Sequence, residues 1–508
     1  MRAPYILAML LIAAALSTSA LAASREPGFF GINAPLYYPG SGILFTPQMA
    51  DNLNDLGARW VRLEFIRETN GTINYSSYDY VVDAAATRGI SVLGILDYSS
   101  VPWYPQEAWS SASFRSVFVN RVSEIVSHFS PRITAWEIWN EEDCTFYVEP
   151  NAYAELLRQS YDTIKAIDPS ATVVLGGLCF NDYLNSLYES PSFSSYHPMD
   201  AVGVHPYNWT SGPYSYMTYY LRDYIKPVMN AHGDNDKRLW LTEVGWNVCP
   251  DSPTSVGPGQ SVESNEQKQA LYVSQLFALT ATLTDHGETE PLVEKILLFN
   301  YGDFGTDWFG VIRGEGTKRP SFYAFKVASG GPMQEGEEYL PAGWNLFSIP
   351  LCPDDPAADS VLSACVDAGN DLTGNLYGYA GIYLPYPGDL ADLSVGAGYW
   401  LRLTNGSLVS YWGTAAESSY DVPLSGWTLV GHPRAAAVAW ADVEVTDGAT
   451  TLAVPDAAAA GWIQGQAFYY DGAGYHTLDV SGGDDTHLRP WSGYWVLANV
   501  PGLSLLIP

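Results

Sequence analysis

The sequence predicts an α/β fold, a (β/α)8 or TIM barrel, followed by an all-β region of two repeated modules. Two observations predict this order. From residue 29 to about residue 330, strand-like apolar runs alternate eight times with amphipathic helical runs. Near residue 335 the helical period disappears, and Gly, Pro, Ser, Tyr and Trp punctuate short alternating strands that repeat internally.

The eight apolar runs are almost continuous, as expected for parallel strands that are buried on both faces. They are FFGINAPLY, RWVRLEFIR, ISVLGILDY, ITAWEIWNE, TVVLGGLCF, MDAVGVHPY, LWLTEVGWN and KILLFNYGDF. Helical segments such as FRSVFVNRVSEIVSHF and AYAELLRQSYDTIKAI lie between them. Eight such units in roughly 300 residues fit a closed barrel. An open doubly wound sheet is the alternative, but no glycine-rich phosphate loop follows the first strand.

The C-terminal region contains the same pattern twice. LPAGWNLFSIP matches VPLSGWTLVGHP, GAGYWLRL matches WSGYWVLA, and NLYGYAG occupies the place of QAFYYDG. A period of roughly 85–95 residues indicates two copies of one small β module, sandwich-like or barrel-like. We therefore expect the barrel over residues 23–333 and the modules over residues 334–420 and 421–508.

The first 22 residues have the pattern of a signal peptide. Arg2 supplies the positive region, residues 6–16 are apolar, and Ala20-Leu21-Ala22 is a small-x-small cleavage site. A membrane anchor is the alternative, but the apolar stretch is short for a bilayer, and no other segment is apolar enough to span one. The sequence thus predicts a secreted protein, extracellular or periplasmic, without a transmembrane segment.

The charge of the chain restricts its partners. The formal net charge is −31, and it becomes −32 without residues 1–22, which carry Arg2 and no acid. Such a charge disfavours nucleic acid, anionic membranes and strongly acidic polymers as partners, unless a local basic pocket overrides the average. The 17 Trp and 35 Tyr are numerous enough to supply flat faces for sugar rings as well as core residues.

Five cysteines are present, and secretion permits disulfides. Cys352 and Cys365 lie close in one module and are the preferred pair. Cys144 and Cys179 follow neighbouring strands and could also pair, which leaves Cys249 most simply unpaired. No cysteine or histidine cluster has zinc spacing, so we predict neither a metal nor a cofactor.

In a (β/α)8 barrel the chemistry lies at the carboxyl ends of the strands. Glutamates at the ends of the fourth and seventh strands, Glu141 and Glu243, would face each other across the barrel mouth. Such a pair is what a retaining glycosidase needs, because one carboxyl protonates the leaving oxygen while the other attacks the anomeric carbon. Other polar residues at strand ends are Arg62, Glu64, Asp97, Asn140, His205, Tyr207, Asn300, Tyr301 and Asp303.

The motifs WEIWNE and LWLTEVGW resemble clan A of the glycoside hydrolases, over residues 29–330. The resemblance implies that Glu141 is the general acid/base and Glu243 the nucleophile. It also implies that Asn140 holds the sugar 2-hydroxyl, that His205 and Tyr207 line the site and that Arg62 hydrogen-bonds the nucleophile. Within the clan, EIWNEED and TEVGW look most like family 39, with family 5 as the runner-up.

This sequence departs from the clan pattern in two places. Glu142 follows the acid/base where many relatives have Pro, and a second carboxylate there could raise the pKa of Glu141. The eighth strand lacks the Trp that often floors the site, so Tyr301 or Trp308 is expected to replace it.

Aromatic residues cluster in the loops that follow the strands, among them Trp103. Stacking on sugar rings and packing within the loops are both compatible with such residues. As a group they favour a cleft for several sugar units and an endo-acting enzyme. We assign Asp97, Trp103 and Trp246 to substrate binding together with the residues above.

The sequence therefore predicts a retaining β-glycoside hydrolase that cleaves a polysaccharide or oligosaccharide through a covalent glycosyl-enzyme. An inactive carbohydrate-binding or cell-surface attachment protein on the same barrel is the alternative, and residues 334–508 would suit attachment in either case. A transglycosylase would use the same residues and differ only in how well it excludes water.

Overall fold

The computed structural model describes residues 27–508 except 195, 209–211, 287, 304–306, 332, 417–418 and 481. The predicted signal peptide, residues 1–22, lies outside the described residues. The chain divides into two compact units, Met1–Gly331 and Pro332–Pro508. The sequence prediction placed this boundary after residue 333. Each unit is considered by itself.

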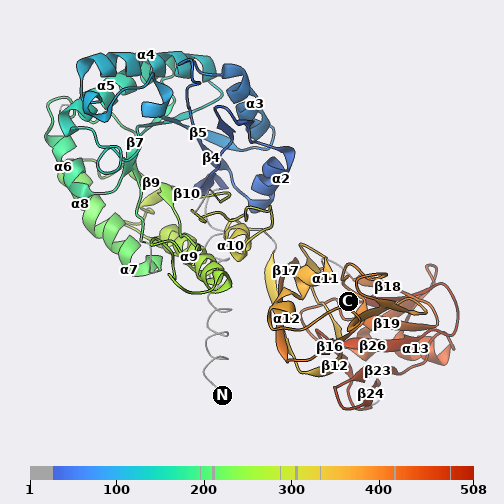
Figure 1. Ribbon diagram of the computed structural model, residues 1–508. Coiled ribbons are helices and arrows are strands. Elements are labelled where there is room, and N and C mark those ends of the chain that lie inside the picture. Colours follow the sequence, from blue (N-terminus) through green and yellow to red (C-terminus); the bar gives the residue numbers. More distant parts are fainter. Residues whose placement is uncertain are drawn as a thin grey trace. The chain divides into compact units, whose positions relative to one another are not determined.

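The first unit is a closed barrel of eight parallel strands surrounded by helices (Figure 1). The strands neighbour one another in the order β1-β10-β9-β8-β7-β6-β5-β4. All eight predicted strands form, so the barrel is confirmed and the open sheet is excluded. Their bounds are Phe30–Asn33 (β1), Trp60–Glu64 (β4), Ser91–Leu96 (β5), Ala135–Ile138 (β6), Thr172–Leu178 (β7), Ala201–Val204 (β8), Arg238–Val244 (β9) and Val293–Leu298 (β10).

Helices connect successive strands, and their ends follow from local sequence. Thr46 caps the first long helix by accepting from Met49 N, Pro47 opens it, and Gly57 ends it at a positive φ of 80°. The helices are α2 Pro47–Leu56, α3 Tyr75–Ala86, α4 Ala112–Phe129, α5 Pro150–Ile167, α6 Asn181–Glu189, α7 Pro213–Met217, α8 Lys226–Ala231, α9 Val262–Thr282 and α10 Pro320–Ala328. Shorter elements are η1 Pro27–Phe29, η2 Tyr98–Ser100, η3 Gln106–Ala108, the π-helical η4 Thr218–Ile225, and the hairpin of β2 Tyr37–Tyr38 and β3 Gly42–Ile43.

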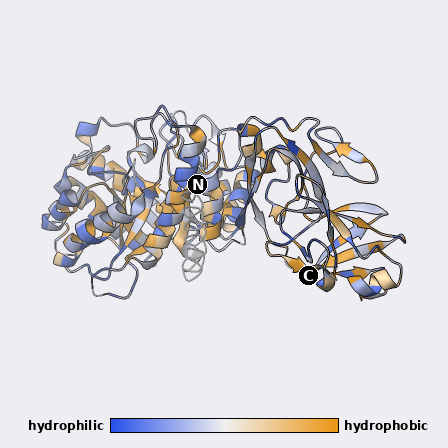
Figure 2. Cartoon of the chain, turned by 90° about the horizontal axis from the view of Figure 1, so that it is seen from below, coloured by the Kyte–Doolittle hydropathy of each residue, from blue (hydrophilic) through white to orange (hydrophobic). Residues whose placement is uncertain are grey.

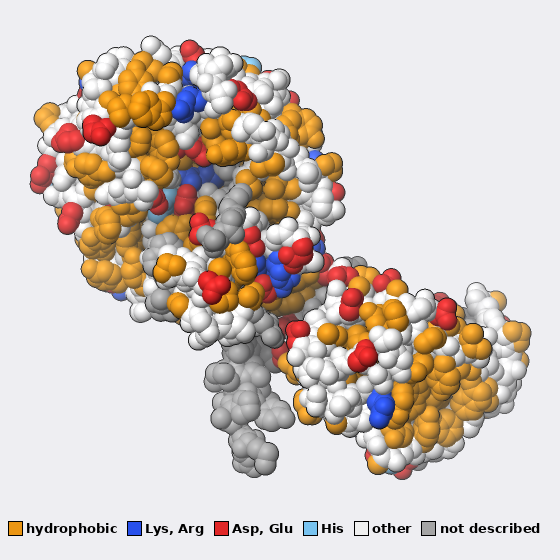
Figure 3. Space-filling model, in the orientation of Figure 1, with side chains coloured by type: hydrophobic (Ala, Val, Ile, Leu, Met, Phe, Trp, Pro, Cys, Tyr) orange, Lys and Arg blue, Asp and Glu red, His pale blue; other side chains and the backbone are white. Residues whose placement is uncertain are grey.

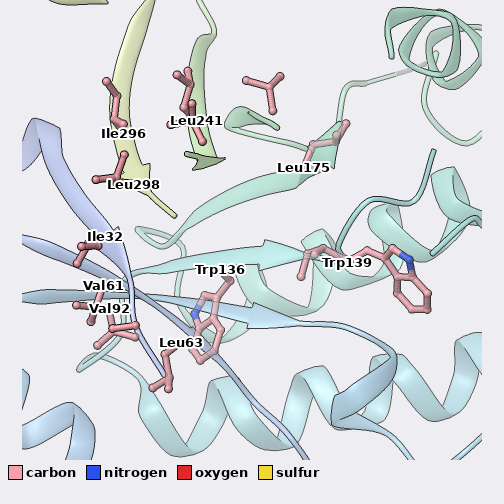
Figure 4. Packing of buried hydrophobic residues seen from close by; sticks show 14 of the residues in the cluster. Ile32, Val61, Leu63, Val92, Trp136, Trp139, Leu175, Leu241, Ile296 and Leu298 are labelled. Carbon is pink, nitrogen blue, oxygen red and sulfur yellow. The ribbon is translucent and has the colours of Figure 1, made fainter. Parts of the chain in front are cut away.

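The alternation of side chains along the strands separates two layers of core. One alternate set fills the barrel interior, and its members are Leu93, Ala135, Val174, Ala201, Trp240 and Leu297. The other set, which includes Ile32, Val61 and Leu298 (Figure 4), belongs to a larger cluster that also contains the buried residues of the helices. The helices complete this layer with their hydrophobic faces and carry hydrophilic residues outward (Figure 2). Polar side chains of a site can therefore occupy the remaining inward-facing positions, near the carboxyl ends of the strands.

The second unit consists of two modules with similar strand arrangements. Each module packs a core between two antiparallel sheets, which fits the expected sandwich-like fold. The first module has sheets β11-β17-β13 and β12-β16-β14-β15, and the second has sheets β18-β27-β21-β22 and β19-β26-β23-β24 with the pair β20-β25.

The strands of the first module are β11 Gln334–Leu340, β12 Gly343–Ser348, β13 Cys352–Pro353, β14 Leu376–Tyr379, β15 Tyr383–Pro385, β16 Gly398–Leu403 and β17 Ser407–Thr414. Those of the second are β18 Tyr420–Leu424, β19 Trp427–Gly431, β20 Val438–Ala439, β21 Glu444–Thr446, β22 Thr451–Ala453, β23 Ala467–Tyr470, β24 Tyr475–Leu478, β25 His487–Leu488, β26 Gly493–Leu497 and β27 Leu503–Ile507. Short helices are α11 Ala358–Val361, α12 Ser363–Asp367, η5 Trp440–Asp442 and α13 Val454–Ala459.

The two modules are joined by contacts that repeat about an approximate two-fold axis. Ser348 N donates to Trp491 O at 3.0 Å, and Gly431 N donates to Gly396 O at 2.8 Å. The sequence repeat aligns Ser348 with Gly431 and Trp491 with Gly396, so the two bonds are equivalent. Each module therefore offers the same strand edge to the other, and the pair forms one compact unit.

One disulfide links Cys144 to Cys179 and so joins the segments that follow β6 and β7. Cys249, Cys352 and Cys365 are free. The preferred Cys352–Cys365 pairing is therefore wrong. Cys365 is buried in the module core, and its thiol approaches Leu408 O at 3.7 Å, whereas Cys352 lies on β13 at the far edge of the sheet.

In the part of the chain that the structure describes, no helix is long and apolar enough to cross a membrane.

The disulfide assignment predicts a stability effect at Cys144 and Cys179. Replacing both by serine should lower the free energy of unfolding by about 2–4 kcal/mol, because the disulfide restricts the unfolded chain. Chemical denaturation of the parent and the double variant measures this loss. Cys352→Ser is the control and should change stability little. Peptide mapping without reductant should recover the Cys144–Cys179 cross-link, and a Cys352–Cys365 cross-link would contradict the assignment.

Candidate active site

A buried arginine connects three strands at the centre of the barrel. Arg62 on β4 is buried, and its Nε donates to Glu137 Oε2 at 2.5 Å. Its Nη1 donates to Glu243 Oε1 at 2.5 Å, and its Nη2 donates to Asn140 Oδ1 at 2.8 Å. Burial alone would lower the pKa of Arg62, but the charges of Glu137 and Glu243 raise it above its usual value. The guanidinium is thus a fixed positive charge beneath the site.

Glu243 reaches the site because β9 carries an extra residue. Thr242 and Glu243 together face Leu297 of β10, where a regular ladder would have one residue on each strand. A bulge of this kind re-aims a side chain, and bulges are frequent beside active sites. Thr242 shares a hydrogen bond with His205, while Glu243 still extends to Arg62. The side chains of Thr242 and Glu243 therefore both point into the barrel interior, although the two residues are adjacent in sequence.

The second oxygen of Glu243 is held by a phenol. Tyr207, which follows β8, donates its hydroxyl to Glu243 Oε2 at 2.9 Å. Burial, and then the charge of Glu243, raise the pKa of Tyr207 well above its usual value, so the hydroxyl remains a donor. Each oxygen of Glu243 therefore accepts a hydrogen bond from a side chain of the protein.

Glu141 lies in a strained turn after β6. Trp139 has φ 80° and Glu141 has φ 53°, in the left-handed region that bulky residues rarely adopt. The indole of Trp139 holds the turn, because it is fully buried (Figure 4) and donates Nε1 to Phe146 O at 2.9 Å. The backbone between them presents Asn140 to Arg62 and Glu141 to the barrel mouth.

His205 and Gly177 complete the geometry around Glu141. His205 Nδ1 lies 3.2 Å from Glu141 Oε1 and 3.9 Å from Glu243 Oε2. A Cβ at Gly177 of β7 would lie 2.0 Å from His205 Nε2, so only glycine leaves room for this imidazole. A ring nitrogen of His205 and one carboxylate oxygen from each glutamate lie within 4.8 Å of one another. The structure thus brings the two predicted catalytic glutamates together.

The environment of Glu141 differs from the sequence-based expectation. Burial would raise the pKa of Glu141, but the hydrogen bond and charge of His205 outweigh it, so the pKa lies below its usual value. Glu142 does not raise it. A Cβ at Gly176 would lie 2.3 Å from Glu142 Oε2, which places the Glu142 side chain against the backbone of β7 in full burial. Burial, and then the charge of Asp143, raise the pKa of Glu142 itself well above its usual value.

Asp97 and Glu64 form a second acidic pair at the ends of β5 and β4. Asp97 is 1% exposed and accepts a hydrogen bond from Ser99 N at 2.7 Å. Burial, and then the charge of Glu64, raise the pKa of Asp97 well above its usual value, and burial also raises the pKa of Glu64. Glu64 lines the cavity beside Glu243, so Asp97 is linked to that cavity through Glu64.

The other predicted binding residues lie around the mouth in different environments. Trp103 is 75% exposed, whereas Trp246 is fully buried and donates Nε1 to Asn208 O at 3.1 Å. Tyr301 is buried, and its hydroxyl accepts from Asn52 at 2.9 Å. Trp308 is partly buried after β10. Their contacts with substrate stay predictions. Trp246 is buried and its bond to Asn208 O supports the loop that follows β8.

A cavity of about 260 Å³ opens beside Glu243. Figure 3 shows the hollow at the centre of the barrel, with acidic, basic and histidine side chains at its base. Its lining residues are Asn33, Ala34, Pro35, Leu36, Tyr37, Tyr38, Arg62, Leu63, Glu64, Ile66, Ile95, Glu243, Phe299 and Asn300. Much of this wall follows β1, which the sequence analysis did not include among the candidate strand ends.

Two residues of the site were missed although the sequence carries a signal for them. Asn33 ends β1 and donates to Thr242 O at 2.9 Å and Leu297 O at 3.0 Å, which ties together the strands beneath Glu243. Glu137 is a charged residue in the otherwise apolar run of β6 and is fully buried against Arg62. Strand-end position identifies the first, and a charge inside an apolar strand identifies the second.

The spacing of Glu141, His205 and Glu243 would also suit three ligands of a metal ion. Arg62 lies 2.5 Å from Glu243, and its fixed positive charge opposes a cation at that carboxylate. The arrangement is better suited to acid/base and nucleophilic chemistry by two differently held carboxyl groups.

Comparison with known proteins shows that this part of the chain is similar to glycosidases. A model of glycosyl hydrolase family 10 matches residues 58–189, which include Arg62 and Glu141. The match supports clan A, but the family model that matches is that of family 10, whereas the motifs indicated family 39 with family 5 as the runner-up.

Two curated xylanases are similar to a part of this chain about as long as the part that the family model matches. "Endo-1,4-beta-xylanase A" of Humicola insolens is 25% identical over 148 residues, 27% of this chain and 37% of that protein. "Endo-1,4-beta-xylanase 3" of Hypocrea jecorina is 27% identical over 166 residues, 28% of this chain and 45% of that protein. The chain thus spans less than half the length of these curated relatives. A solved family 39 glycoside hydrolase from Bacteroides cellulosilyticus WH2 aligns with a TM-score of 0.47 at 16% identity, over 74% of this chain and 81% of that chain.

The low pKa of Glu141 is expected to depend on His205. In His205→Ala the bond and charge that most stabilise the Glu141 carboxylate are lost. Burial is then opposed only by the smaller effects of Thr145 and Arg62, and the pKa of Glu141 should rise. Carbon NMR of labelled glutamate side chains measures this pKa, with Glu141→Gln identifying the signal. His197→Ala removes a histidine that pairs with Asp234 elsewhere and should leave the pKa of Glu141 unchanged. An unchanged pKa in His205→Ala would contradict the assignment.

Proposed function

We propose that the chain is a secreted retaining β-glycoside hydrolase that cleaves a neutral polysaccharide or oligosaccharide. One observation carries the proposal: carboxylate oxygens of Glu141 and Glu243 lie within 4.8 Å of each other, and Arg62 bonds only Glu243 of the two. Retaining glycosidases hold their carboxyl groups about 5–5.5 Å apart, whereas inverting enzymes need about 6.5–9.5 Å to admit a water molecule. An inactive attachment protein would have no need for Arg62 and Tyr207 aligned on one carboxylate.

In the first step Glu243 attacks the anomeric carbon as its carboxylate, and the bond to the leaving oxygen breaks. Arg62 and Tyr207 each bind one oxygen of Glu243, so the carboxylate is already oriented for attack before the substrate binds. Glu141 gives its proton to the leaving oxygen. Asn140 is fixed by its bond to Arg62, which leaves its amide Nδ2 as a donor for a sugar hydroxyl.

In the second step Glu141, now a carboxylate, removes a proton from water, and the resulting oxygen attacks the glycosyl-enzyme ester. Inversion at each step restores the β configuration. His205 lies between both glutamates and stabilises the carboxylate form of Glu141 that this step requires. For the first step, a bound sugar ring excludes water from Glu141 and strengthens the burial effect that favours its acid form.

The relatives support a polymer as substrate. They are named endo-1,4-beta-xylanases, so β-1,4-xylan is the first substrate that we propose, with cleavage inside the polymer. The net charge of −31 favours a neutral polymer of this kind over an acidic one. A transglycosylase would need an acceptor sugar that outcompetes water at the second step.

We also propose that the protein acts outside the cytoplasm. The signal-like residues 1–22 support secretion, and so does the Cys144–Cys179 disulfide, because such bonds persist mainly in oxidising compartments.

Removing either carboxyl should abolish hydrolysis. Glu141→Gln and Glu243→Gln keep the side-chain shape but cannot donate the proton or form the ester. We expect β-1,4-xylan hydrolysis to fall at least about 10²–10⁴-fold in each. Reducing-sugar release measures the loss, and circular dichroism checks that the variants are folded.

Glu142→Gln is the matched control, because Glu142 is adjacent in sequence but buried against β7. Its activity per folded molecule should remain close to that of the parent. Near-parental turnover in Glu141→Gln or Glu243→Gln would remove that residue from its role, and an equal collapse in Glu142→Gln would mean that the acid is misassigned.

The product should first appear with the β configuration. In the proposed double displacement the two carboxyl groups are too close for a water molecule between Glu243 and the anomeric carbon, so the carboxylate itself attacks; the closeness of their oxygens, within 4.8 Å, supports this. Proton NMR of the anomeric signal during the first minutes of xylo-oligosaccharide cleavage, before mutarotation, tests this. An initial α anomer would indicate direct attack by water and a different role for Glu243.

A further inference from the structure

The C-terminal unit carries an aromatic face on two of its four-stranded sheets, β12-β16-β14-β15 and β19-β26-β23-β24. Outward positions alternate with buried ones along β14, β16 and β26, and outward positions also occur on β12, β15, β19, β23 and β24. They place ten aromatic rings on one surface, which we call the aromatic face: Trp344, Tyr377, Tyr379, Tyr383, Trp400, Trp427, Phe468, Tyr470, Tyr475 and Trp495.

These rings form a continuous network that crosses from one module to the other. Trp400 of the first module contacts Tyr470 of the second, with ring centroids 5.2 Å apart. The equivalent pair, Tyr379 and Trp495, is 4.8 Å apart. The sequence repeat aligns Trp400 with Trp495 and Tyr470 with Tyr379, so both contacts follow the approximate two-fold axis. The aromatic face is thus built by the joining of the modules, and neither module has it alone.

A groove of about 480 Å³ is cut into this face and is lined by Trp344, Tyr377, Tyr383, Trp400 and Tyr470. Small-molecule sites have volumes of roughly 300–1,000 Å³. The groove is open to solvent, since Trp344 is 40% and Tyr383 53% exposed. Figure 3 shows a broad field of hydrophobic side chains on this unit, in the region where Figure 1 places β16, β26 and β23.

We propose that the aromatic face is a second carbohydrate-binding site, which takes a segment of a neutral β-linked polysaccharide apart from the active site. A pyranose ring in a β-linked chain offers a flat face of C–H groups, and these suit the negative faces of aromatic rings. The hydroxyls of Tyr379, Tyr383 and Tyr475 make no hydrogen bond to other described residues, so they are available to sugar hydroxyls. Arg402, outward on β16 opposite Trp344, adds donors at the edge.

Charge favours this occupant over a second copy of the chain. Every copy carries a formal charge of −31, so two copies repel each other as they approach. An acidic polymer meets the same repulsion, and a neutral glycan meets none. The inference takes from the proposed function only the class of polymer, and binding at this face does not require that the barrel be active.

The test compares retention on insoluble polymers with hydrolysis of a small substrate. The full chain carrying Glu243→Gln, which cannot cut the polymer, is partitioned between buffer and insoluble β-1,4-xylan or cellulose. Trp344→Ala with Tyr383→Ala removes two exposed rings of the groove and should reduce the partition constant at least about tenfold. Tyr339→Ala is the matched control: Tyr339 is 57% exposed on β11, outside the aromatic face, and its loss should leave retention unchanged.

With Glu243 intact, the double variant should hydrolyse a soluble xylo-oligosaccharide as fast as the parent. The inference is overturned if the parent is retained on neither polymer, or if the double variant is retained as well as the parent. It is also overturned if light scattering shows concentration-dependent dimers that the double variant loses while retention is unaffected. Retention that depends on the groove in a chain without hydrolytic activity would support this inference and refute the proposed function.

Discussion

The buried charge of Arg62 is the interaction on which the rest of the active site depends. Taking a guanidinium out of water costs several kcal/mol unless its charge and its donors are paired. Arg62 meets this requirement on three sides, at Glu137, Glu243 and Asn140. Two of these partners are the residues that contact substrate in the proposed mechanism. The pairing that compensates the buried charge therefore also orients Glu243, the proposed nucleophile, and the amide of Asn140.

The two glutamates lie close together but have different partners, and that difference separates their roles. Glu243 is bonded on one side by Arg62 and on the other by Tyr207, so both of its oxygens are held as acceptors. Glu141 has only His205 among these groups. Its environment can therefore change when a sugar binds, whereas both oxygens of Glu243 are held in place by the protein. The strained turn at Trp139 and the glycine at position 177 provide the space that this arrangement needs.

The C-terminal unit illustrates how a duplicated sequence can produce a feature that neither copy contains. Each module has its own core between two sheets. In an isolated module, the aromatic rings on the outward side of one sheet would contact only rings of the same module. Equivalent hydrogen bonds at Ser348 and Gly431 join the two sheets edge to edge. Trp400 and Trp495 then each meet a tyrosine of the other module, which makes one surface from two. A chain that holds a polymer at such a surface raises the effective concentration of that polymer at any second site on the same molecule.

Much of this architecture could be read from the sequence, because it follows from local patterns. Apolar runs such as RWVRLEFIR and LWLTEVGWN identify buried parallel strands, and strand-end position alone points to Arg62, Glu141 and Glu243. The repeat around Trp344 and Trp427 identifies two similar modules. In each case residues close in sequence determine the outcome, or a fold rule brings strand ends together.

What the sequence could not determine depends on contacts between distant segments. Neighbours on other strands determine three features of the site. These are the bulge at Thr242 and Glu243, the orientation of Glu142 away from the site, and the effect of His205 on the pKa of Glu141. The preferred disulfide was wrong for the same reason: Cys352 and Cys365 are close in sequence, but Cys365 is buried in the module core and Cys352 lies on the edge strand β13. Cys144 and Cys179, the other pair that the sequence allowed, meet because β6 and β7 are adjacent. Local periodicity determines which elements form and which ends carry polar residues. Only tertiary packing decides where a side chain points and which partner sets its charge, because both depend on atoms supplied by other strands.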